Sequence, residues 1–341
     1  MKLIFKKPTI ETQKAMSHAA LNPFTGRGIN PEIKSAEESV KELTGHEHVK
    51  LVNSGNSTII STMNALKGPF ILPDQGGWIG LKKIAEFLKR EVYFIPTEKG
   101  IIYPDLLEEY LKQLKTNPSA LFITSFAGYT AEQPVKELFE VCCENNIILV
   151  EDASGSVGDP EKRLCNGNHA HIIIASTGSP KIVNVGNGGF ISTNEKRILD
   201  NSRFLLKTLK ADPITAAGIS TEIKKAPFNL FETMHACKIL KKNIQNTFHE
   251  DKRGINVIVP SNDPKAHSRI LREKINLDGR SIITTCPLYD RLMEKAVCIE
   301  IKNLDTDCLN RGNLSEIKEH IETTVFNTSN NEYAMHPKLK W

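Results

Sequence analysis

Short apolar runs alternate with amphipathic stretches through the first half of the chain. Residues 32–43 are expected to form a helix, the run HVKLVN (48–53) a strand, and residues 57–66 the next helix. More apolar runs follow in GPFILP, EVYFIP, ALFITSF, NIILVEDA and HIIIAST, with helices expected near 79–89, 104–115 and 133–145. Runs rich in Ile, Val and Phe with helices between them predict a mainly parallel sheet that is covered on both faces.

The pattern changes after Thr193. Long helices are expected in EKRILDNSRFLLKTLK and FETMHACKILKKNIQNTF, and helices at 264–274 and 314–325 are expected beside short strands near 255–260, 280–285 and 297–301. We therefore expect a large α/β domain over residues 1–245, of which 1–30 form an N-terminal arm, and a small α+β domain over 246–326. Residues 327–341 are polar and have no period, which predicts a surface tail.

Composition narrows the class of protein. The 341 residues contain 44 Lys+Arg against 40 Asp+Glu, a net charge of +4, and no long basic block, so nucleic acid is not an expected partner. Lysines interrupt the apolar N-terminus, which argues against a signal peptide, and no window approaches the roughly 20 apolar residues of a membrane span. We expect a cytoplasmic protein whose seven scattered cysteines are thiols rather than a disulfide framework.

Polar residues follow the expected strands, and ligands of open parallel sheets bind outside the carboxyl ends of the strands. The first strand leads into Ser54-Gly55-Asn56-Ser57, where a glycine and a helix N-terminus favour an anion such as a phosphate. Capping of the helix by Asn56 or Ser57 explains the same residues equally well. The segment PDQGGW then places Trp78 in a loop at this edge, for stacking or for the core.

The later expected strands are followed by residues whose side chains can ionise or react. NIILVEDASG ends in Glu151 and Asp152, and a buried acid requires a cation or hydrogen-bond donors. HIIIAST leads to Ser176 and Lys181, and a lysine at the mouth of a site can form a Schiff base with a carbonyl compound. An anion site, an aromatic face, a buried acid and a nucleophilic amine are together what pyridoxal 5'-phosphate (PLP) requires.

On these motifs the chain resembles the fold-type I PLP enzymes and, within them, the DegT/DnrJ/EryC1/StrS aminotransferases. SGNSTIISTMNAL is similar to the family's SGTxAL strand-turn-helix, EDASG to its EDAAQ, and STGSPKIVNVGNGGFIST to its lysine-bearing segment. The resemblance implies an aspartate aminotransferase-like fold with a mainly parallel seven-stranded sheet and a small C-terminal α+β domain. It also implies PLP as the cofactor and a homodimer with active sites at its interface.

The resemblance implies roles for individual residues. Lys181 would carry PLP as an internal aldimine and move the proton during transamination between an amino donor and a small or sugar-type carbonyl acceptor. Asp152 would face the pyridine nitrogen, and Asn229 would reach the phosphate of the neighbouring subunit. Lys181 and Asp152 are therefore the expected catalytic residues. The expected cofactor-binding residues are Ser54, Gly55, Asn56, Ser57, Trp78, Asp152, Ser154, Ser176, Lys181 and Asn229.

The substrate and the reaction class stay open at this point. Family residues around the substrate are replaced by Gly155, Thr177, Gly178 and Asn187. Candidates for a carboxylate-binding arginine are Arg27, Arg269, Arg272 and Arg280. A PLP-dependent lyase or desulfurase, the latter using Cys165, would keep the same cofactor site, as would a PLP-binding regulatory protein without turnover. A metal hydrolase is a rival because of the pairs His46/His48 and His169/His171.

Overall fold

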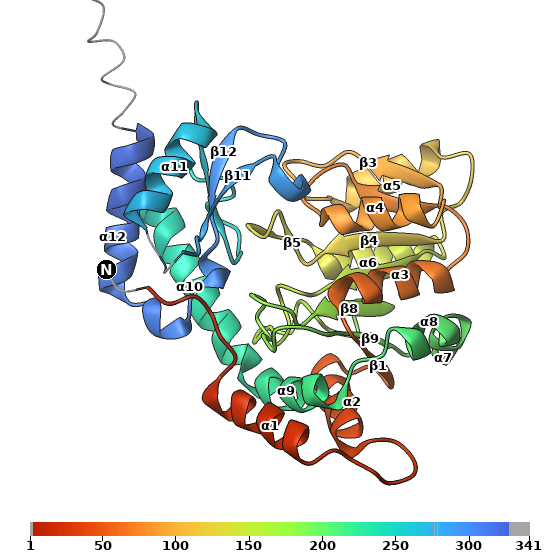
Figure 1. The fold of residues 1–341 in the computed structure, drawn as a ribbon. Coiled ribbons are helices and arrows are strands. Elements are labelled where there is room, and N and C mark those ends of the chain that lie inside the picture. The colour runs from red at the N-terminus through yellow and green to blue at the C-terminus, as the bar shows by residue number, and fades with distance from the viewer. Residues whose placement is uncertain (1–2, 276, 278, 327–341) are drawn as a thin grey trace, which may run out of the picture.

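A seven-stranded sheet in the order β1-β9-β8-β7-β4-β2-β3 forms the larger part of the molecule (Figure 1). The computed structural model describes residues 3–275, 277 and 279–326. Strand β9 pairs antiparallel with β1 and with β8, and the other neighbouring strands are parallel. This confirms the mainly parallel seven-stranded sheet. The strands are β1 (His48–Val52), β2 (Phe70–Pro73), β3 (Val92–Ile95), β4 (Ala120–Thr124), β7 (Ile148–Asp152), β8 (Ile172–Ser176) and β9 (Gly189–Thr193).

Both faces of this sheet are buried, because successive strand residues belong to different cores. Phe122 packs in one core and Ile123 in the other. One face is covered by α3 (Gly55–Ala65), α4 (Ile79–Phe87), α7 (Lys196–Asn201) and α8 (Arg203–Thr208). The other is covered by α2 (Pro31–Thr44), α5 (Pro104–Gln113), α6 (Val135–Glu144) and α9 (Pro213–Glu222). Burial on both sides explains the nearly continuous apolar runs in the sequence.

A smaller part of the molecule surrounds a three-stranded antiparallel sheet in the order β10-β12-β11. Its strands are β10 (Val257–Pro260), β11 (Ile283–Cys286) and β12 (Ala296–Ile299), and its helices are α11 (Pro264–Lys274) and α12 (Arg311–Ile321). The long helix α10 (Ala226–Asn243) enters it from beside α9 (Figure 1). Its core also includes Leu3 and the α10 residues Ala236 and Leu240, which precede the boundary expected near residue 245. The tail expected over 327–341 lies outside the described residues.

Two local expectations differ from the structure. The single helix expected in EKRILDNSRFLLKTLK is interrupted between α7 and α8, because buried Ser202 donates its hydroxyl to the carbonyl of Ser61 at 2.5 Å and accepts from Asn64. A short hairpin of β5 (Phe126–Ala127) and β6 (Ala131–Glu132) follows β4 and was not expected.

Helix α1 (Ile10–Leu21) packs on α9. Within the described ranges, no helix is both long and apolar enough for a bilayer span.

Candidate active site

A cavity of about 510 Å³ lies at the carboxyl ends of the large sheet, facing the smaller part of the molecule. Strand β1 runs parallel to β8, since both are antiparallel to β9, so the ends of β1, β2, β7 and β8 share one edge. Ser57 and Asn229 are not among the residues that line this cavity. The other expected site residues all line it: Ser54, Gly55, Asn56, Trp78, Asp152, Ser154, Ser176 and Lys181.

The turn from β1 into α3 has the form expected of an anion-binding corner. Ser54 caps α3, because its hydroxyl accepts the Ser57 N–H at 3.2 Å. The Ser57 hydroxyl donates to Asn53 at 2.6 Å, so that side chain shapes the turn. A Cβ on Gly55 would lie 2.6 Å from the Cβ of Ser176, so only glycine lets the α3 turn pack against the end of β8. The first-turn amides of α3 and the nearby hydroxyls can hold a phosphate.

Trp78 forms the aromatic wall of the cavity. Its indole N–H donates to the side-chain carbonyl of Asn56 at 3.3 Å, which ties the loop before α4 to the α3 turn. Gly80 leaves room for the ring, because a Cβ there would lie 2.3 Å from the indole nitrogen. On the far side, Tyr289 of the smaller part packs with its ring centroid 5.7 Å from that of Trp78.

Asp152 is buried at the end of β7, where Ser154 fixes its carboxylate. The Ser154 N–H and hydroxyl donate to the same carboxylate oxygen at 3.0 and 2.5 Å. The Ser154 hydroxyl accepts the Ser176 N–H at 2.8 Å, which couples Asp152 to the end of β8. Burial raises the pKa of Asp152, while the Ser154 hydrogen bonds and the Lys181 charge act in the opposite direction. A cationic ring nitrogen placed here would stabilise the ionised form.

Lys181 projects into the same cavity from the loop between β8 and β9. Its amine lies 5.9 Å from the Trp78 ring centroid and 5.3 Å from that of Tyr129. Tyr129 adopts a left-handed backbone conformation, with φ of 63°, in the tight β5–β6 hairpin. The amine therefore lies beside two aromatic rings and close enough to Asp152 to interact with its charge.

Sequence reasoning missed the residues that the smaller part of the molecule contributes. These are Thr284, Tyr289, Arg291, Glu300 and Lys302. Glu300 directly follows the apolar strand β12, so an acid at the end of an apolar run, the signal noted at Asp152, was present here too. The four arginines considered from sequence are exposed and do not line the cavity.

The missed charges form a buried cluster. Arg291 donates to the Thr284 hydroxyl and to the Glu300 carboxylate, and Asn303 donates to the other Glu300 oxygen at 2.6 Å. Burial opposes ionisation of Glu300, but the charges of Lys302 and Arg291 outweigh it and lower the pKa of this carboxyl. Burial lowers the pKa of Lys302 to about 8, and the charges of Lys181 and Arg291 act in the same direction.

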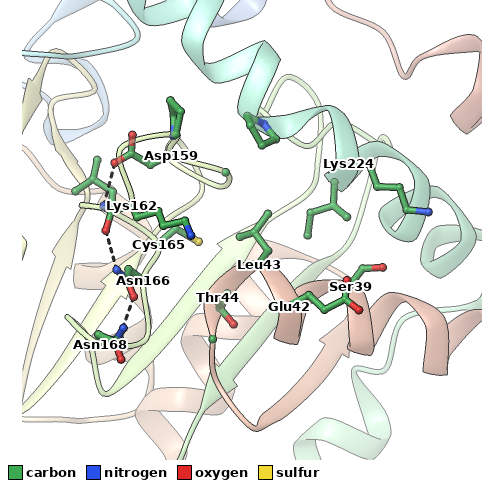
Figure 2. A pocket seen from close by; sticks show the side chains of 16 residues that line it. Ser39, Glu42, Leu43, Thr44, Asp159, Lys162, Cys165, Asn166, Asn168 and Lys224 are labelled. Atoms are coloured by element: carbon green, nitrogen blue, oxygen red, sulfur yellow. Dashed lines mark hydrogen bonds between the residues drawn. The ribbon is translucent and has the colours of Figure 1, made fainter.

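A larger cavity, of about 640 Å³, lies between the end of α2, the loop 158–168 and the start of α10 (Figure 2). The loop satisfies its own polar groups there: Asn166 donates to the Lys162 carbonyl at 2.7 Å and accepts from the Asn168 N–H at 3.0 Å. Cys165 lines this cavity and not that of Lys181. Burial and the nearby Glu151 raise the pKa of this thiol well above its usual value, contrary to what a desulfurase nucleophile needs.

One histidine of each pair, His46 and His171, forms hydrogen bonds with neighbouring groups of the fold. His46 is buried, and its ring bonds the Ser192 hydroxyl and the Ala170 carbonyl, both at 3.0 Å. The His171 ring accepts the Leu149 N–H at 3.0 Å. Among residues 3–275, 277 and 279–326, no three His, Cys, Asp or Glu side chains gather as a metal site would require.

Comparison with known proteins agrees with this geometry. Putative pyridoxal phosphate-dependent aminotransferase EpsN of Bacillus subtilis is 24% identical over 185 residues, 52% of this chain and 47% of EpsN. UDP-4-amino-4,6-dideoxy-N-acetyl-beta-L-altrosamine transaminase of Campylobacter jejuni is 25% identical over 177 residues, which are 51% of this chain and 46% of the transaminase. The chain thus spans about half the length of these curated relatives.

Solved structures share the fold. Helicobacter pylori PseC, an aminotransferase involved in the biosynthesis of pseudoaminic acid, superposes with a TM-score of 0.76 at 14% identity, over 96% of this chain and 100% of PseC. Alanine–glyoxylate aminotransferase from Nostoc gives 0.69 at 14% identity over 95% of both chains. Residues 227–322 match the MJ1341 family C-terminal domain. Residues 10–216 match the DegT/DnrJ/EryC1/StrS aminotransferase family, and the chain therefore belongs to that family.

Proposed function

We propose that this chain is a PLP-dependent aminotransferase that moves an amino group from an amino donor to a small or sugar-type carbonyl acceptor. One observation carries the proposal: Lys181, Asp152, Trp78 and the N-terminus of α3 line one cavity in a chain of this family. The alternatives of a lyase, a desulfurase or a non-catalytic PLP-binding protein are not favoured by that membership. Cytoplasmic location remains a prediction from the sequence.

The residues present fit PLP, the cofactor that the family indicates. The α3 turn and Ser176 would hold the phosphate in the corner that Gly55 keeps open. Trp78 would contact the ring, and Asp152, already fixed by Ser154, would pair with the ring nitrogen. Each contact uses a group whose orientation the surrounding hydrogen bonds already fix.

The chemistry is divided between the cofactor and the protein. When bound, PLP supplies an electron sink for the charge that develops on the substrate Cα. Asp152 would keep the ring nitrogen protonated, because a buried anion next to that atom favours its charged form. Lys181 would take the proton from the substrate Cα as a general base and deliver it as a general acid to the cofactor carbon that bore the aldehyde. Trp78 and Tyr129, which flank this amine, would limit the access of water and so strengthen the local electrostatic interactions.

We further propose that the protein works as a homodimer in which Asn229 contacts the cofactor phosphate of the partner subunit. Asn229 does not line the cavity of its own chain. Phe228 and Phe231, on either side of it in α10, expose 57% and 51% of their surface. Exposed aromatic residues beside a buried polar residue are expected where a second chain packs.

The test compares the wild type with Lys181→Ala and with Lys83→Ala, an exposed lysine of α4. With PLP and borohydride, mass spectrometry should locate a pyridoxyl group on the Lys181 peptide of the wild type and of Lys83→Ala. With L-glutamate, these two proteins should convert bound cofactor to its amine form. Attachment that persists in Lys181→Ala, or a wild type that no amino acid converts, would contradict the proposal.

A further inference from the structure

The cavity contains a second buried amine for which the proposed function has no role. Lys302 lies in the short helical turn η3 (Ile301–Asn303) after β12, lines the cavity together with Lys181, and exposes only 6% of its surface. A buried ammonium loses the hydration that stabilises its charge, so an amine at this depth in an active-site cavity is a candidate for a functional role. The inference that follows rests on the proposed function, because it takes Lys181 as the amine that binds PLP.

The ring of Tyr129 brings the two amines together. The ammonium of Lys181 lies 5.3 Å from the Tyr129 ring centroid, and that of Lys302 lies 5.6 Å from the same point. Two unit charges roughly 10 Å apart in a protein site change the proton affinity of each other by about tenfold. A charge on Lys302 is therefore felt at the nitrogen of Lys181, and the charge of Lys181 acts on Lys302 in return.

Hydrogen bonds fix Lys302 along its whole length. The Tyr129 carbonyl accepts the Ile255 N–H at 2.9 Å, and the Ile255 carbonyl accepts the Lys302 N–H at 3.0 Å, so the backbone of Lys302 is joined to the Tyr129 turn. At the other end, the ammonium donates to the Asn303 side chain at 2.7 Å and lies 3.6 Å from the Glu300 carboxylate. The charge of Lys302 therefore has a defined place in the cavity wall.

Glu300 does not neutralise this charge alone. Its carboxylate already accepts from Arg291 and from the Asn303 amide, the latter at 2.6 Å. Two cations, Arg291 and Lys302, share this single carboxylate, so the wall that the smaller part of the molecule supplies has a net positive charge among its described residues. The nitrogen of Lys181 faces that wall.

A positive wall has a consequence for a Schiff base formed at Lys181. An amino donor arrives as an ammonium ion and must lose one proton before it can attack. An imine nitrogen that is unprotonated accepts this proton; the neutral amine then bonds to the carbon that bore the aldehyde, and Lys181 leaves as a free amine. A nearby positive charge disfavours the protonated imine and so keeps the nitrogen available for this transfer.

We infer that Lys302 is a positioning residue that acts on Lys181 through its charge: it weakens proton binding by the Schiff base, so that the imine accepts the proton of the incoming amine near neutral pH. The groups that face Lys302 are Glu300, Arg291, Lys181, Cys298, Tyr129 and Asn303. Burial lowers the pKa of Lys302 to about 8, so its charge is present at pH 7 and is lost as the pH rises further.

The test follows the absorption of the PLP-loaded protein as the pH is changed and records the midpoint between the protonated and the unprotonated Schiff-base bands. It compares the wild type with Lys302→Met, Lys302→Gln and Lys302→Arg. The glutamine amide can still donate to Asn303 but carries no charge, and arginine retains the charge. Lys265→Met, at an exposed lysine of α11, is the matched control. Thermal unfolding verifies the fold, and borohydride reduction with mass spectrometry verifies that PLP is bound to Lys181.

The midpoint should lie about one pH unit higher in Lys302→Met and Lys302→Gln than in the wild type, which corresponds to about tenfold tighter proton binding. Lys302→Arg and Lys265→Met should keep the wild-type midpoint. An unchanged or lower midpoint in the two neutral variants would overturn the inference. So would an equal upward shift in Lys302→Arg, which would assign the effect to packing rather than charge. A wild type that forms no borohydride-reducible bond at Lys181 would instead contradict the proposed function.

Discussion

Gly55 allows the close packing that shapes the proposed phosphate corner. Because a Cβ there would lie 2.6 Å from the Cβ of Ser176, Gly55→Ala must push the α3 turn away from the end of β8. Overpacking of this kind costs about 1–3 kcal/mol, so we expect PLP to bind about five- to 150-fold more weakly if the displaced corner bears the whole cost. Titration of the apoprotein, followed by cofactor absorbance, measures the change.

The control for this prediction is Gly312→Ala, in the first turn of α12. A Cβ at Gly312 would have its nearest neighbour at 3.4 Å, in ordinary contact. Alanine also favours helix over glycine by about 1 kcal/mol, so this variant should bind PLP normally and unfold at the same or a higher temperature. Unchanged PLP affinity in Gly55→Ala would show that the corner does not hold the phosphate.

Lys302 gives the stability of the protein a pH dependence. Burial lowers the pKa of this lysine to about 8 in the folded chain. Between about pH 8 and 10.5 the unfolded lysine binds a proton that the folded one does not, so unfolding becomes less favourable as pH rises. The groups that act on Lys302 are Glu300, Lys181, Arg291, Cys298 and Asn303.

The comparison for this prediction is Lys302→Met, measured at the same pH values. Urea unfolding of the wild type should gain stability relative to Lys302→Met from pH 8 to 10. A parallel gain of stability in both proteins would assign the titration to another group.

Cavity residues that lie after their own strand could be predicted from sequence, and residues placed by distant packing could not. The chain order of the apolar runs predicted that Asp152, Trp78 and Lys181 would lie together, because parallel strands bring their carboxyl ends to one edge. Arg291 reaches the same cavity only because its loop crosses from the smaller part of the molecule. Tyr129 depends on a hairpin turn with φ of 63°, which the run SFAGYTAEQP did not reveal.

At the scale of elements, the loop Leu288–Met293 connects the two parts of the molecule above the site. The Asp290 carbonyl accepts the Gly76 N–H at 2.7 Å, and the Met293 N–H donates to the Gln75 side chain at 2.8 Å. Lys82 of α4 pairs with the Asp290 carboxylate at 2.9 Å. These contacts hold Arg291, in the middle of the loop, over the Trp78 side of the cavity.

Lys82→Met should therefore loosen the docking of this loop without unfolding the protein. The pair is partly exposed and contributes about 1 kcal/mol at most, so we expect the Gly76 and Met293 amides to exchange their hydrogens two- to fivefold faster. The melting temperature should change by only a few degrees. Lys83→Met, at the exposed neighbouring position, should behave as the wild type. Equal exchange rates in the two variants would show that the ion pair does not hold the loop.

The elements themselves were largely predictable. Residues 264–274 form α11 as expected, and the helices after β1, β2 and β3 begin within a few residues of their predicted starts. Periodicity succeeds there because each helix buries one face against the sheet. It failed at Ser202, where a buried hydroxyl bonds to the Ser61 carbonyl and interrupts a continuous apolar pattern. Such a contact depends on a residue far away in the sequence, which no local pattern encodes.

At the scale of the whole molecule, exposed apolar side chains agree with the proposed homodimer. Large apolar residues are exposed on α1, in the segment after it, and on α9 and α10. They are Ile10, Leu21, Phe24, Ile29, Ile214, Phe228 and Phe231. Helices α1 and α9 pack against each other, and Figure 1 places both at the side of the large sheet from which α10 departs. A surface of this kind is expected to be covered by another subunit.

If Asn229 contributes to the partner's site, as proposed, the inactive variant Lys181→Ala and the impaired variant Asn229→Ala should complement each other. In a mixed dimer of Lys181→Ala and Asn229→Ala, one site combines both changes and the other combines Lys181 with an unaltered Asn229 from the opposite chain. Mixing should therefore restore activity toward half of the wild-type value per mixed dimer, although Lys181→Ala alone is inactive and Asn229→Ala alone is impaired. Refolded mixtures, with Lys181→Ala plus Lys181→Ala as the control, are assayed with L-glutamate. No recovery in a mixture that is shown to contain mixed dimers would mean that Asn229 acts within its own chain or not at all.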